Sequence, residues 1–126
     1  MRKRWRQGFI VLAAGAAIAL MAAPDRASAA SFEGNWSLLV ITESGTCDRA
    51  YRYPIKVQSG QIHYTGEAGI DIHGNVGQDG KINASVRRGD QGATGSGQLT
   101  QTAGTGNWAG RSATGACNGR WEAERR

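Results

Sequence analysis

Residues 51–58 read YRYPIKVQ, a stretch in which tyrosine, tyrosine, isoleucine and valine occupy every second position. Successive side chains of a β-strand point to opposite faces, so this stretch predicts a strand with one buried face. Pro54 falls on the other face and has no backbone N–H to donate. It predicts a bulge or an irregular stretch at that point of the strand.

The same alternation recurs on both sides of this strand, and no stretch after Ser31 shows helical periodicity. Glycine-containing turns interrupt the alternation about every ten residues. We expect strands at 34–43, 47–58, 61–66, 69–76, 81–88, 92–100, 105–111 and 117–124. The connections are too short for crossover helices, so consecutive strands pair antiparallel, and closure removes the two exposed edges. The sequence predicts an all-β fold, a small antiparallel eight-stranded up-and-down barrel.

Counting with a period of two assigns the side chains that face the barrel interior. They are Trp36, Leu38, Val40, Tyr51, Tyr53, Ile55, Val57, Ile62, Tyr64, Ile70, Ile72, Val76, Ile82, Ala84, Val86, Leu99, Trp108, Trp121 and Ala123. The inward positions of strand 92–100 are nearly bare, since they hold Ala93, Gly95, Gly97 and Leu99. We interpret the bare positions as space for the tryptophan rings opposite. A disordered glycine-rich chain is the alternative, and regular apolar faces argue against it.

The N-terminal segment has the three parts of a cleavable secretory signal peptide. Four basic residues lie within the first six positions, an apolar run of 15 residues spans 9–23, and Ala27-Ser28-Ala29 follows. The run is shorter than the roughly 20 residues that cross a bilayer as a helix. We therefore expect a signal peptide at residues 1–29, a single β-barrel domain at residues 30–126, and a periplasmic or secreted location.

The net charge of +5 belongs mainly to the expected signal peptide. Residues 1–29 hold five basic groups and one acid, whereas residues 30–126 hold ten basic groups and nine acids, a difference of +1. A domain so close to neutral has no electrostatic basis for binding phosphate backbones or anionic lipid. We expect no nucleic-acid partner.

Cys47 and Cys117 are the two cysteines, and both lie in the expected exported part. Two cysteines in a short exported chain most simply form one disulfide. By parity both sulfur atoms face inward, so the bridge would join the first hairpin to the last at one end of the barrel. A reactive thiol or a metal ligand is the alternative, but neither cysteine has a CxxC partner or a nearby histidine.

An outer-membrane barrel is also an exported meander, but it carries its apolar residues outward. Here the outward face is polar, for example at Lys56, Asp71, Asn83 and Thr94. We expect a soluble domain that is not embedded in a membrane, and we expect a monomer.

No set of residues forms a catalytic, cofactor or metal site in this sequence. His63 and His73 fall on the outward face, and a zinc site would need three or four converging ligands. The run of oxygen-bearing residues from Asp71 to Asp79 lacks the glycine and glutamate of a calcium loop, and no serine lies in a G-x-S-x-G elbow. A hydrolase built on Asp71 and Asp79 remains as an alternative to a non-enzymatic protein.

Gly34-Asn35-Trp36 resembles the G-x-W that opens calycin-type barrels, the lipocalins and avidins, which implies a calycin-like fold. The small periplasmic inhibitors of bacterial metalloproteases also combine an early G-x-W with a cysteine soon after it. Cys47 matches that placement, whereas Cys117 lies far downstream of the expected second position. Residues 117–126 are similar to the endings of small exported proteins of Gram-negative bacteria, which implies export and assigns no activity.

A complete scaffold without catalytic groups indicates a non-enzymatic binding protein, because function on such barrels lies in loops and mouths. The expected partner is an unidentified protein or small ligand. If the barrel has a pocket, Trp36, Tyr51, Trp108 and Trp121 would line it. We favour an interior that these aromatic side chains fill, because an eight-stranded barrel has just enough room for its own side chains. An inhibitor of a protease or lysozyme is another function considered.

Overall fold

The computed structural model describes residue 15 and residues 29–126. The signal peptide expected at residues 1–29 lies outside this described part, except for Gly15 and Ala29. Within the described part, no helix is long and apolar enough to span a bilayer.

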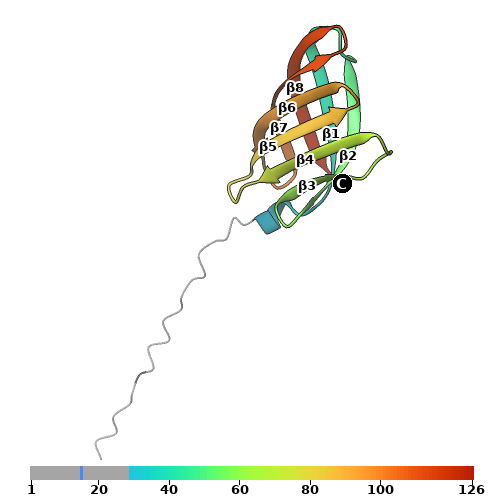
Figure 1. The fold of residues 1–126 in the computed structure, drawn as a ribbon. Coiled ribbons are helices and arrows are strands. Elements are labelled where there is room, and N and C mark those ends of the chain that lie inside the picture. Colours follow the sequence, from blue (N-terminus) through green and yellow to red (C-terminus); the bar gives the residue numbers. More distant parts are fainter. Residues whose placement is uncertain (1–14, 16–28) are drawn as a thin grey trace, which may run out of the picture.

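Residues 29–126 form a short 3₁₀ helix followed by a closed barrel of eight antiparallel strands in sequence order (Figure 1). The elements are η1 (Ala29–Phe32), β1 (Gly34–Ser44), β2 (Ala50–Gln58), β3 (Gln61–Tyr64), β4 (Ile70–Val76), β5 (Lys81–Arg88), β6 (Gln91–Leu99), β7 (Ala103–Ser112) and β8 (Gly115–Arg125). β1 pairs with both β2 and β8, which closes the barrel. The predicted fold class and all eight predicted strands are confirmed.

The largest boundary difference concerns β2, which begins at Ala50 rather than at residue 47. Residues 45–49 form a loop, opened by Gly45 in the left-handed region at a φ of 97°. The loop is fastened to β1, because Thr42 donates its hydroxyl to Asp48 O at 2.6 Å and its N–H to Arg49 O at 2.8 Å. These local hydrogen bonds replace the strand pairing that alternation predicted.

The bulge predicted at Pro54 is wrong. The pairing of β2 with β1 runs through Pro54 without a shift, and Ser37 lies opposite it. The Pro54 carbonyl accepts from Thr65 N, on the side of β3. The missing N–H therefore points to the same side, next to the last β2–β3 pair at Ile55, so it affects only the end of that pairing. The irregularity lies in β1, where its register against β8 shifts between Thr42 and Ser44.

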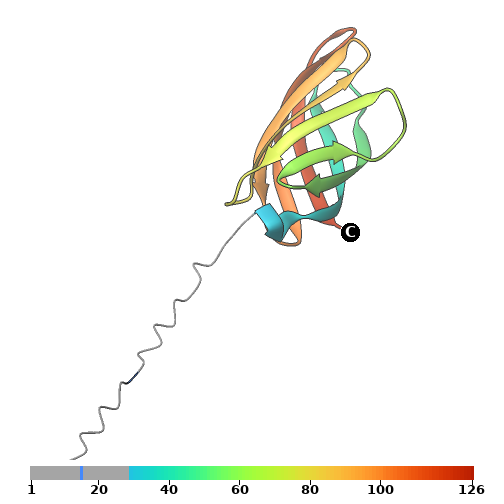
Figure 2. The same cartoon turned by 60° about the horizontal axis from the view of Figure 1, so that its bottom comes forward.

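The two ends of the barrel differ. Both views place η1 and the C-terminus at one end, which we call the closed end (Figures 1 and 2). Phe32 of η1 is buried there, and Trp36 at the start of β1 donates its indole N–H to Phe32 O at 2.8 Å. The open end carries the loops 45–49, 65–69, 89–90 and 113–114.

The predicted inward face is confirmed by the pattern of burial. The buried residues of the core are Phe32, Trp36, Ile55, Val57, Ile62, Ile72, Val76, Ile82, Leu99, Trp121 and Ala123. Tyr51 differs from the prediction, since it is 37% exposed. It lies at the start of β2 on the rim of the open end, where the barrel no longer surrounds it.

Two tryptophans lie over strands that carry glycine. Trp121 on β8 is paired with Gly106 on β7 and donates its indole N–H across that strand to Ser96 O of β6, at 3.1 Å. Trp108 on β7 is paired with Gly119 on β8 and donates across it to Ile41 O of β1, at 3.0 Å. Each ring passes over a position without a side chain. Gly97 on β6, one of the positions predicted to be bare, also lies against Trp121, since a Cβ there would be 2.5 Å from Cζ2 of the indole, which confirms the interpretation of this position as space for a tryptophan ring.

Cys47 and Cys117 form the predicted disulfide, with their Cα atoms 6.1 Å apart. Cys47 lies in the 45–49 loop and Cys117 lies in β8, so the bridge joins the first hairpin to the last at the open end. Cys117 is buried, and Cys47 donates its N–H to Cys117 Sγ at 3.1 Å.

Gly106→Ala should lower the free energy of unfolding by about 1–3 kcal/mol, the usual cost of overpacking. A Cβ at this position would lie 2.5 Å from Trp121 Nε1 and nearer still to the Ser96 carbonyl oxygen. Gly92→Ala is the matched control, because the closest atom to its new Cβ would be Val86 O at 3.8 Å. Urea unfolding of both variants provides the measurement, and equal midpoints would contradict the packing described above.

Replacing Cys47 and Cys117 together by alanine should lower the free energy of unfolding by roughly 2–5 kcal/mol, because the bridge closes a long loop of the unfolded chain. Protein prepared without reductant should show no free thiol. Labelling of both cysteines in the native, unreduced protein would disprove the bridge.

Candidate functional site

The barrel encloses a cavity of about 140 Å³ that opens at the open end. All eight strands contribute to its lining, β3 through Ile62 and β4 through Ile72. The walls are apolar apart from the mouth. The interior is thus not completely filled, which leaves room for an occupant of the size of a single small ring.

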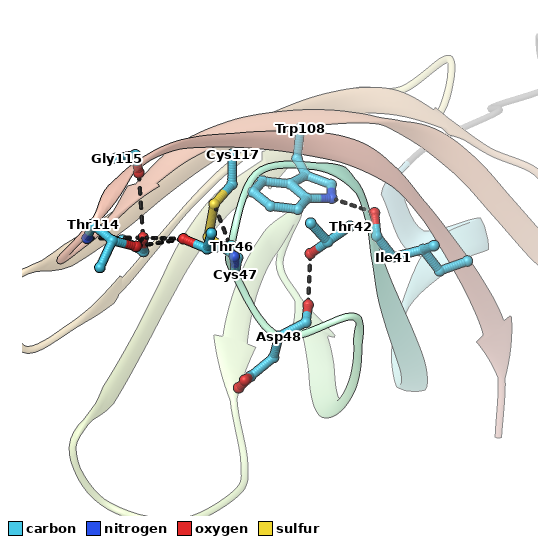
Figure 3. Close-up of a disulfide and its surroundings, with 10 residues drawn as sticks. Ile41, Thr42, Thr46, Cys47, Asp48, Trp108, Thr114, Gly115 and Cys117 are labelled. Atoms are coloured by element: carbon cyan, nitrogen blue, oxygen red, sulfur yellow. Dashed lines mark hydrogen bonds between the residues drawn. A yellow bond between two sulfur atoms is a disulfide. The ribbon is translucent and has the colours of Figure 1, made fainter.

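All four residues expected to line a pocket border this cavity, at different depths. Trp36 is only 1% exposed and forms part of the floor near η1. Trp121 lies in the wall over the glycines of β7, and Tyr51 is on the rim. Trp108 lies beside the disulfide (Figure 3). The structure places these side chains around one space. Occupation of that space by a ligand is taken up below as a proposal.

Sequence reasoning missed the groups at the mouth. Asp48, Arg88 and Arg111 border the cavity where it meets solvent. Arg88 is the last residue of β5 and continues the inward series of that strand through Val86. The period-two count could have found it, but the count was applied only to apolar residues.

Three tyrosines of β2 and β3 form an aromatic cluster, and two of them, Tyr51 and Tyr53, line the cavity. The rings of Tyr51 and Tyr53 are 4.6 Å apart between centroids, and Tyr53 meets Tyr64 edge-on at 6.0 Å. The Arg88 guanidinium lies 5.9 Å from the Tyr51 ring centroid, within the range of a cation–π interaction. The mouth therefore combines aromatic surface with a held positive charge.

Partial burial raises the pKa of the Tyr53 hydroxyl above its ordinary value, because desolvation disfavours the phenolate. The positive charge of Arg88 acts in the opposite direction and offsets part of this rise in pKa. The balance shows that the mouth around Tyr53 is only partly exposed to water, and that Arg88 is near enough to influence it.

The rim around the disulfide is held by a group of short polar contacts (Figure 3). Thr46, in the 45–49 loop, is hydrogen-bonded to Thr114, and Thr114 in turn is 3.0 Å from the Ser112 hydroxyl. These contacts and the bridge fix the loop on the β7–β8 hairpin. One side of the mouth is therefore cross-linked to the barrel.

The histidines and carboxylates considered for catalysis lie on the outside. His63 and His73 are both exposed and are direct neighbours across β3 and β4. Asp71 is near the start of β4, whereas Asp79 lies in the turn after β4 and contacts Lys81 at 3.9 Å, so the two carboxylates stand at opposite ends of that strand. Within the described residues no three His, Cys, Asp or Glu side chains gather closely enough to hold a metal ion.

Comparison with protein-family models, with curated proteins and with solved structures finds no match to this chain.

The raised pKa of Tyr53 predicts a pH dependence at alkaline pH. A phenol that ionises later in the folded state stabilises the fold fully below its unfolded pKa of about 10. That stability is lost as the pH rises through the higher folded pKa. When phenolate absorbance is followed during an alkaline titration, tyrosine should ionise at a higher pH in the folded protein than in the urea-unfolded chain. Tyr53→Phe should remove this difference. Superimposable folded and unfolded titrations would contradict it.

Proposed function

We propose that this protein is an exported, non-enzymatic binding protein that holds one small apolar ligand inside its barrel. The observation that carries the proposal is the cavity of about 140 Å³, apolar in its walls and open at one end. Ligand sites in proteins are typically concave, apolar and bordered by a few polar groups. The cavity has these features, with its polar groups gathered at the mouth.

The proposed location is the periplasm or the exterior of the cell. It is supported by the signal-peptide pattern of residues 1–29 and by the disulfide, since disulfides persist in oxidising compartments. The near-neutral charge of residues 30–126 supports a small ligand over nucleic acid. We propose that the domain is soluble and acts as a monomer, consistent with the polar outward positions on β4 to β7.

The size of the cavity limits the ligand. A cavity of about 150 Å³ with apolar walls is known to hold one benzene molecule. The ligand body should therefore be a single six-membered ring or a chain of comparable volume. Larger molecules would have to leave part of themselves outside the mouth.

Thermal unfolding in the presence of toluene or hexan-1-ol tests the proposal. A ligand at ten times its Kd stabilises the folded state by roughly 1.4 kcal/mol. For a domain of this size, each kcal/mol of stabilisation raises Tm by about 4–8 °C. Tryptophan emission should change as well, because Trp36, Trp108 and Trp121 border the cavity.

Ala93→Leu should abolish the shift, because Ala93 borders the cavity and a leucine would project three more carbons into it. Ala109→Leu is the matched control, since Ala109 is exposed on the neighbouring strand β7. It should leave the ligand-dependent shift intact. Absence of any shift in the wild-type protein up to the solubility of both ligands would overturn the proposal and indicate a filled interior.

A further inference from the structure

Arg88 is the positive charge best placed to meet a ligand in the cavity. It borders the cavity at the mouth, and no carboxylate among the described residues lies within 4.0 Å of it. The three ion pairs formed within residues 29–126 involve Lys81 and Arg120. The guanidinium donors of Arg88 are thus not engaged by an acid of the described chain.

The position of Arg88 is supported by aromatic surface. Its guanidinium lies 5.9 Å from the Tyr51 ring centroid, and Tyr51 in turn is packed on Tyr53. A guanidinium held over a ring loses less rotational freedom when it binds a ligand than a free side chain does. The contact with Tyr51 therefore holds the Arg88 guanidinium in position for a ligand at the mouth.

Arg88 is the charged side chain at the mouth that suits an anion. Asp48, Arg88 and Arg111 are the ionised residues that border the cavity, and Arg111 alternates with the inward-facing Trp108 and Gly110, so its side chain starts from the outward face of β7. Asp48 opposes an anion, but its residue is held in the 45–49 loop by its backbone carbonyl, which accepts from Thr42. Arg88 is carried at the end of β5, which does not adjoin the strands that hold this loop.

A carboxylate is the anion whose shape fits these donors. The planar guanidinium presents paired N–H groups that match the two oxygens of a carboxylate, and such charge-assisted hydrogen bonds are stronger than neutral ones. The cavity below Arg88 has apolar walls and the volume of about one benzene ring. A ligand that satisfies both parts is an apolar body of that size with one carboxylate.

We propose that the ligand is a small amphipathic monocarboxylate, whose ring or short alkyl chain fills the cavity while its carboxylate accepts hydrogen bonds from Arg88. This inference rests on the proposed ligand-binding function and adds the chemical class of the ligand. In this arrangement the body of the ligand contacts the apolar wall, and its carboxylate lies at the mouth.

Isothermal titration of the mature protein with two matched pairs of compounds tests the inference. Benzoate is compared with benzyl alcohol, and hexanoate with hexan-1-ol, at low salt and neutral pH. Each carboxylate should bind at least tenfold more tightly than its alcohol, because one charge-assisted hydrogen-bond pair separates them.

Arg88→Gln should reduce this preference to about twofold or less, while the affinity for the alcohols stays unchanged. Arg87→Gln is the matched control, because Arg87 precedes Arg88 on β5, points to the opposite face and changes the net charge by the same amount. It should keep the preference. Asp48→Asn should strengthen carboxylate binding severalfold, which provides a gain-of-affinity test that loss of folding cannot imitate.

The outcomes separate the two proposals. If the alcohols bind and the carboxylates bind no better, the carboxylate inference is wrong and the ligand-binding function stands. Equal losses in Arg87→Gln and Arg88→Gln would show a general charge effect and overturn the assignment to Arg88. If toluene, the alcohols and the carboxylates all fail to bind the wild-type protein, the proposed function itself is wrong.

Discussion

The packing of Trp121 against bare backbone determines the interior of this barrel. A Cβ on Gly97 or Gly106 would lie only about 2.5 Å from the indole, so the ring occupies volume that these positions leave empty. Its N–H is satisfied by Ser96 O, which allows a polar group to remain in an apolar core. Trp121 fills part of the barrel in this way, and the space that remains is bordered in part by small residues such as Ala84 and Ala93.

The closed end is held by a single arginine near the C-terminus. Arg125 lies 4.7 Å from the Trp36 ring centroid, and its guanidinium donates to the carbonyls of Ser31, Glu33 and Gln101. One side chain thereby joins η1, the start of β1 and the β6–β7 loop, so the floor of the cavity cannot open without breaking several charge-assisted hydrogen bonds. The cavity opens at the opposite end, where Asp48 and Arg88 border it.

The strands could be predicted because alternation and turns are local properties of the chain. Stretch 51–58 and the glycine turns contain enough information to place them, and period-two counting also placed the indoles opposite bare positions. The contacts of Arg88 and Arg125 could not be predicted, since each depends on neighbours supplied by distant strands after closure. The prediction of a bulge at Pro54 was wrong for a related reason, because the cost of a missing N–H depends on where the partner strand ends. The cavity volume is a small difference between the volume that the barrel encloses and the volume of its inward side chains. Counting residues cannot predict so small a difference.

The disulfide lies at the open end, beside the cavity and not beside the well-packed floor. Empty space in a protein tends to be reduced when the surrounding structure can relax into it. The Cys47–Cys117 bridge, the Trp108 bond to Ile41 and the Thr46–Thr114 contact oppose that relaxation by fixing the 45–49 loop to β7 and β8. A rim that cannot collapse keeps the mouth open in the absence of an occupant, and a preformed site loses less entropy on binding than one that must first be opened. The same bridge that stabilises the fold therefore preserves the only feature of the described interior that a ligand could use.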